Sequence, residues 1–65
     1  FVHLCVYDIT GRRVRILMNE TLPPDYYEVE WDGRDDAGNE LASGVYFYKL
    51  FAGDYSASDK LVFLK

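Results

Sequence analysis

The sequence predicts a single all-β domain, folded as a sandwich or a small barrel. The chain has 65 residues, which is room for one domain at most, and 49% of them are hydrophobic. Short apolar alternations recur along the chain with turn-forming residues between them, as is typical of strands. No window combines the i, i+3, i+4, i+7 apolar spacing of a helix with a capping residue before it.

The first two strands are expected over residues 1–7 and near residues 14–17. In the first, apolar residues occupy both alternating sets, which is typical of a central strand. The intervening Asp8–Gly11 reads as a turn, because Asp accepts bonds from the backbone ahead of it and Gly tolerates positive φ. The change in apolar spacing within residues 14–17 predicts a β-bulge.

A loop and a third strand are expected next. Pro23 and Pro24 cannot donate to a strand ladder, so no central strand passes through them. Within residues 27–31, aromatic and apolar residues alternate with acidic ones. This alternation predicts a half-buried strand.

The last third of the sequence predicts a hairpin of two strands. Val45–Phe51 is the strongest strand in the chain, Ala52–Asp54 is a tight connection, and Tyr55–Lys65 is the final strand. Two interleaved apolar pairs compete for the inward face of the final strand, Leu61 with Phe63 and Val62 with Leu64.

Charge and cysteine content exclude several classes of function. The formal net charge of −4 and the pI of about 4.6 argue against binding to nucleic acid or to an anionic membrane surface. No apolar run approaches the roughly 18 residues of a membrane span. Cys5 is the only cysteine, so it reads as a buried small hydrophobe. His3 shares its strand face, but no third group completes a catalytic set.

The third predicted strand and the glycine-rich segment after it are both acidic. Residues 25–40 hold seven of the eleven acidic residues against one base. A calcium loop needs oxygen ligands at alternating positions, yet Arg34 stands at one of these positions and the register does not match an EF-hand. Weak calcium binding by Asp32, Asp35 and Asp36 is left as an alternative.

Turn chemistry is the favoured reading of this acidic segment. Paired catalytic carboxylates need a cleft and one raised pKa, whereas acids beside glycines in an exposed loop are solvated. Asp32-Gly33 is expected to end the third strand, Asp35–Asn39 to form a turn in which Asp accepts backbone bonds, and Ser43-Gly44 to make a bend directly before Val45. No catalytic residue, metal ligand or cofactor is therefore predicted.

Three motifs of the chain resemble one family. They are V-Y-D-x-x-G-R-x-V over residues 6–14, W-D-G-x-D-x-x-G-x-x-L-x-S-G-V-Y over residues 31–46, and K-[ML]-V-x-L-[KR] over residues 60–65. The sequence is similar to the immunoglobulin-like domain of the flagellar hook-capping protein and to the related C-terminal sorting domains of type IX secretion substrates. The resemblance implies an immunoglobulin or fibronectin III-like β-sandwich. Its structural core would include Trp31, Tyr46, Tyr48 and Gly44.

One departure from the family concerns the start of the chain. Family members begin with an additional strand region that is absent here, so the sandwich is expected to be incomplete at its N-terminal edge, with an open strand edge. We expect residues 1–65 to be a single immunoglobulin-like domain that forms the C-terminal part of a longer protein. Upstream residues of that protein, or a neighbouring chain, would fill the gap by strand addition.

The resemblance implies a non-enzymatic C-terminal sorting or attachment domain of a secreted bacterial protein, located outside the cell or on its surface. The alternative is a structural assembly module, either hook-capping-like or a fibre unit that a neighbour completes. The expected partners are the secretion machinery or neighbouring subunits, with possible self-association through the open edge. Neither nucleic acid nor membrane insertion is expected.

Candidate contact residues differ between these readings. The docking residues expected from the resemblance are Lys60, Lys65, Asp35 and Asp36. A third reading is a carbohydrate-binding module, in which exposed aromatic rings serve as sugar platforms. Its candidates are Tyr26, Phe47 and Phe51.

Overall fold

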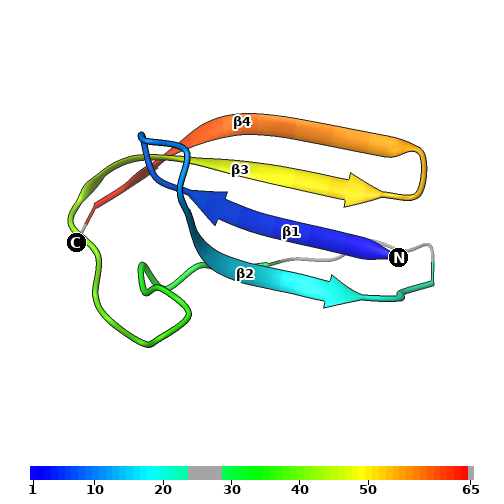
Figure 1. Cartoon of the computed structure of the whole chain (residues 1–65), viewed down its shortest axis with the longest axis horizontal. Coiled ribbons are helices and arrows are strands. Elements are labelled where there is room, and N and C mark those ends of the chain that lie inside the picture. Colours follow the sequence, from blue (N-terminus) through cyan, green and yellow to red (C-terminus); the bar gives the residue numbers. More distant parts are fainter. Residues whose placement is uncertain (24–28, 65) are drawn as a thin grey trace.

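The computed structural model describes residues 1–23 and 29–64, which form one antiparallel sheet (Figure 1). Its strands are β1 (Val2–Tyr7), β2 (Arg13–Glu20), β3 (Gly44–Ala52) and β4 (Tyr55–Phe63), in the order β2-β1-β3-β4. The described residues contain no helix that could cross a membrane. The predicted all-β class is confirmed, and of the two sheets of the expected sandwich the described residues form one.

β1 is a central strand, as predicted, and its ladder with β2 is bulged. The register shifts between Leu4 and Cys5 and again between Val6 and Tyr7. Each shift leaves one residue of β2 without a partner, first Leu17 and then Val14. Both extra side chains pack into the core, because a bulge directs two consecutive side chains of one strand to similar sides.

The β1–β2 turn is held by the side chain of Asp8. Its Oδ1 accepts the backbone N–H groups of Thr10 at 2.9 Å and Arg12 at 3.0 Å, and its carbonyl accepts the N–H of Gly11 at 3.0 Å. The Thr10 hydroxyl donates to the same Oδ1, which is the main reason that the pKa of Asp8 lies below its usual value. The predicted turn over residues 8–11 is confirmed.

β3 and β4 form the predicted hairpin around a two-residue loop. Ala52 pairs with Tyr55, which leaves Gly53 and Asp54 at the turn. Gly53 has a φ of 61° and Asp54 has no positive φ, as a type II′ turn requires. The register decides the inward face of β4: Leu61 and Phe63 point to the core, whereas Val62 is 61% exposed.

The strand predicted over residues 27–31 is wrong in its described part. Residues 29–31 have no strand structure, and residues 24–28 lie outside the described residues. Trp31 packs on the core while Glu30 and Asp32 are exposed, but Val29 is exposed as well, so burial does not follow the alternation in sequence. A strand also needs a ladder partner, and the described part of the chain offers none to this segment.

The two faces of the sheet are unequal. We call the covered face the one that carries Val6 and Tyr46, because residues 29–43, the acidic connection, lie against it. Val6 is fully buried there together with Val14 and Tyr46, and the surrounding side chains are Leu17, Trp31, Leu41, Leu61 and Phe63. Figure 1 shows the acidic connection (green) at the end of the sheet opposite the β3–β4 hairpin.

We call the opposite side of the sheet the open face. Strand alternation and register place one set of side chains on it. This set comprises His3, Cys5 and Tyr7 of β1, Arg13, Ile16 and Asn19 of β2, Val45, Phe47, Lys49 and Phe51 of β3, and Ser56, Ser58, Lys60 and Val62 of β4.

Candidate functional site

Trp31 anchors the acidic connection to the covered face. Its ring meets Tyr46 edge-on at 5.0 Å between centroids and lies 5.2 Å from the ring of Phe63. Its Nε1 donates to the carbonyl of Arg34 at 3.0 Å, and the Tyr46 hydroxyl donates to the carbonyl of Ala42 at 2.6 Å. Both polar ends therefore find backbone partners in the same connection, as buried aromatic residues of this kind require.

Gly33 is needed for the connection to approach the sheet. Its φ is +76°, and a Cβ built on it would overlap the ring of Phe63. No other residue type combines this backbone conformation with so small a volume. Two other expected core residues lie nearby in the fold. Gly44 begins β3, and Tyr48 is half-buried on the covered face.

The carboxylates of the acidic connection bind backbone groups of the chain. Asp32 Oδ1 accepts the N–H of Arg34, and Asp35 Oδ1 accepts the N–H groups of Ala37 at 3.0 Å and Asn39 at 2.9 Å. The bond from the Asn39 backbone is the main cause that lowers the pKa of Asp35. These are the bonds that turn chemistry predicts. Within residues 1–23 and 29–64, no three His, Cys, Asp or Glu side chains gather as a metal site.

Asp36 closes the outer edge of β2. Its N–H donates to the carbonyl of Val14 at 3.0 Å, and its Oδ1 accepts the N–H of Ile16 at 3.0 Å. The side chain of Arg15 on β2 donates two more bonds to the acidic connection, to Asp32 Oδ1 at 3.1 Å and to the carbonyl of Arg34 at 3.0 Å. One loop residue therefore satisfies backbone groups on both sides of Arg15, where an added strand would bind.

The outer edge of β4 carries no neighbouring strand in the described part of the chain. In a hairpin with a two-residue loop, the pair that flanks the loop, here Ala52 and Tyr55, is hydrogen-bonded to each other. Hydrogen-bonded pairs then alternate along the ladder, so every second residue of β4 directs its N–H and C=O groups away from β3. These outward residues are Ser56, Ser58, Lys60 and Val62. The Lys60 N–H donates at 2.8 Å to Oδ1 of Asp59, its own neighbour.

The expected docking residues do not gather in one place. Lys60 lies on the open face at the β4 edge, whereas Asp35 and Asp36 lie in the acidic connection and bind the backbone. Lys65 lies outside the described residues. Their docking role stays a prediction. Sequence reasoning missed the edge-closing role of Asp36, and no local signal marks it, because its partners are twenty residues away.

Two further sequence candidates can now be placed. Cys5 is 1% exposed with its Sγ 3.1 Å from His3 Nε2, and burial raises the pKa of its thiol. Phe47 and Phe51, proposed as sugar platforms, both lie on the open face and are 40% and 49% exposed. Trp31 lies on the covered face, so a ligand on these rings would not contact it.

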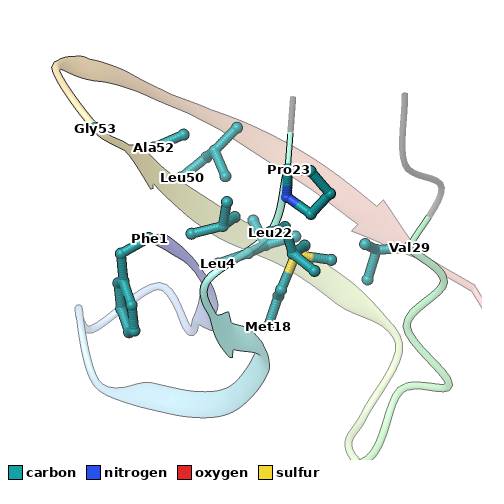
Figure 2. Close-up of a pocket in the computed structure, with 10 residues that line it drawn as sticks. Phe1, Leu4, Met18, Leu22, Pro23, Val29, Leu50, Ala52 and Gly53 are labelled. Carbon is teal, nitrogen blue, oxygen red and sulfur yellow. The ribbon is translucent and has the colours of Figure 1, made fainter. Parts of the chain in front are cut away.

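An apolar depression lies on the covered face, near the N-terminus. Figure 2 shows side chains from β1, β2, β3 and the flanking segments converging on it. Its volume is about 490 Å³. The lining residues are Phe1, Val2, Leu4, Met18, Leu22, Pro23, Val29, Leu50, Ala52 and Gly53. None of these side chains titrates or donates a hydrogen bond, so the depression can accept apolar groups and offers no catalytic chemistry.

Comparison with known proteins identifies the family. The family model described as FlgD Ig-like domain matches residues 1–58. It includes the first two motifs and ends before the 60–65 motif. No curated protein and no solved structure matches the chain. Because the match covers most of its length, the chain belongs to the FlgD Ig-like domain family, the immunoglobulin-like and non-catalytic family of flagellar hook capping.

Proposed function

We propose that the chain is a non-enzymatic structural module of an exported assembly, either hook-capping-like or a fibre unit, and that a strand of a neighbouring protein adds to its sheet. Membership of the hook-capping family supports this assembly role more than type IX sorting. The sorting role stays a prediction, which delivery of a fused reporter to the cell surface would test.

The observation that carries the proposal is the asymmetry between the two sheet edges. At β2, Asp36 uses both its N–H and its carboxylate on the edge backbone. At β4, four alternate residues direct backbone groups outward over a nine-residue strand. Unpaired edge groups of this kind bind an extended segment by main-chain hydrogen bonds. The neighbour's strand is therefore expected along β4.

The thin core supports the need for a neighbour. Among the described residues, only four hydrophobic side chains are buried: Cys5, Val6, Val14 and Tyr46. A domain of this size buries a smaller fraction of its surface than a larger domain does, and it is marginally stable without additional contacts. An added strand extends the sheet beside the half-buried Leu61 and Phe63.

The experiment compares Ser58→Pro with Ser58→Ala in the whole chain. Proline removes the outward N–H at the middle of the β4 edge and leaves the bonds to β3, while alanine keeps this N–H and serves as the matched control. We expect the unchanged chain and the alanine variant to associate in sedimentation velocity as concentration rises. The melting temperature should rise with concentration, by about 4–8 °C for each kcal/mol of added stability. The proline variant should stay monomeric.

Two results would contradict the proposal. One is a chain that is monomeric and cooperatively folded, with the same melting temperature at every concentration. The other is a Ser58→Pro variant that associates as strongly as the alanine control, since the contact would then avoid the β4 edge.

A further inference from the structure

The open face carries three cations and no carboxylate. Cross-strand register sets Tyr7 and Phe47 side by side between Arg13 and Lys60, in one row across the four strands. Lys49 lies in the next row, with its Nζ 5.1 Å from the centre of the Tyr7 ring. This face is therefore positive, although the whole chain has 11 acidic and 7 basic residues.

These three cations differ from the other described bases in having no acidic partner. The bases off the open face are paired: Arg12 with Asp8 at 3.4 Å, Arg15 with Asp32 at 3.1 Å and Arg34 with Glu40 at 3.5 Å. Within residues 1–23 and 29–64, no ion pair involves Arg13, Lys49 or Lys60. Their positive charge is thus available to an acidic group from outside the molecule.

Apolar side chains surround the cations. Val45, Phe47, Phe51 and Val62 are 40–61% exposed on this face. A shallow hollow of about 280 Å³ lies beside Lys49 and Phe51, and its floor includes Ser56 and Ser58. Exposed aromatic residues and arginine are enriched at protein interfaces relative to ordinary surface. With its exposed apolar side chains and unpaired cations, the open face resembles a protein interface whose partner would carry acidic groups.

The acidic connection has the complementary charge. It holds five acids (Glu30, Asp32, Asp35, Asp36 and Glu40) against one base, Arg34. The backbone bonds that Asp35 accepts lower the pKa of its carboxyl. It lies along the β2 edge, where Asp35 and Asp36 border one hollow with Arg13. Lys49 and Lys60 stand on β3 and β4, away from this edge.

We propose that the open face of one copy of this chain binds the acidic connection of a second copy. This inference rests on the proposed assembly role and adds a second contact surface to it. The contact is heterologous, so a pair of copies keeps one free open face and one free acidic connection, and the assembly can extend. The contact rests on exposed charge pairs, and such pairs contribute little in solvent. A single contact should therefore be weak.

A charge-swap experiment tests this contact. Lys49→Glu/Lys60→Glu reverses the charge of the open face. Glu30→Lys/Glu40→Lys brings the net charge of the acidic connection from −4 to zero without removing the carboxylates that bind the backbone. Sedimentation velocity should show association of the unchanged chain and little of either variant alone. An equimolar mixture of the two variants should associate again, because the unchanged open face of one variant then meets the unchanged acidic connection of the other.

Two single substitutions distinguish a local contact at the open face from an effect of the net charge of the chain. Lys60→Glu and Arg12→Glu change the net charge equally, but only Lys60 lies on the open face. We expect Lys60→Glu to weaken association roughly tenfold and Arg12→Glu to have little effect. Circular dichroism checks that each variant is folded.

Three outcomes would overturn the inference: a chain that stays monomeric, equal effects of Lys60→Glu and Arg12→Glu, or variant mixtures that fail to associate. If the double variants associate as the unchanged chain does while Ser58→Pro does not, the β4 edge alone makes the contact. The proposed function would then stand and the open-face contact would be rejected.

Discussion

Replacing Gly33 with alanine tests the packing of the acidic connection on the sheet. The new Cβ overlaps the Phe63 ring, and the backbone has a φ of +76°. The left-handed conformation costs a residue with a Cβ about 1–2 kcal/mol. Overpacking of a filled core costs typically 1–3 kcal/mol more. Together they amount to roughly 2–5 kcal/mol, against a total stability of roughly 3–10 kcal/mol for 65 residues.

Gly38→Ala is the matched control for this substitution. Gly38 has a φ of +87°, but nothing lies within 4 Å of the position of its Cβ. It should therefore lose only the backbone part, about 1–2 kcal/mol. Urea unfolding followed by Trp31 fluorescence gives both values. If Gly33→Ala costs no more than Gly38→Ala, the contact between Gly33 and Phe63 does not constrain the fold.

Three more predictions concern single side chains. Asp36→Ala should lower the free energy of unfolding by about 1–3 kcal/mol, because the Ile16 N–H loses its acceptor; Asp36→Asn keeps an oxygen there, so an equal loss in urea unfolding would argue against the edge role. The pKa of Asp35 is lowered by folding, so its contribution to stability is full above the ordinary value of 3.8 and is lost as the pH falls through the lowered value. In Asp35→Asn, the free energy of unfolding should depend less on pH between about pH 5 and 2. If this pH dependence is unchanged, it comes from other titratable groups. The Cys5 thiol is buried with a raised pKa, so a thiol reagent should modify it only at the rate of unfolding, and fast modification of the native chain would contradict this.

Local turn chemistry explains what the sequence predicted well. Asp8, Gly11 and Gly53 act within a few residues of their own positions, so the β1–β2 turn and the β3–β4 hairpin were predictable from residue type and spacing. The bulge in β2 was predictable for a related reason, since it appears as a change in apolar spacing. The backbone bonds of Asp35 likewise follow from its own loop.

Contacts that are distant in sequence explain what was missed. Alternation over residues 27–31 predicted a strand, but in the described residues Val29 is exposed and Trp31 is half-buried through its packing on Tyr46 and Phe63. The closing of β2 by Asp36 depends on a loop that returns to a strand twenty residues earlier. The charge of the open face depends on the register of four strands, which no single segment contains.

Hydrogen exchange of the backbone amides tests the central claim most directly. Along the β4 edge, the N–H groups of Ser56, Ser58 and Val62 point outward, while the Ile16 N–H at the β2 edge already binds Asp36. If the module adds a strand at β4, the three β4 amides should become protected as the chain concentration rises, with no change at Ile16. Rapid exchange of these three amides at every concentration would contradict the account.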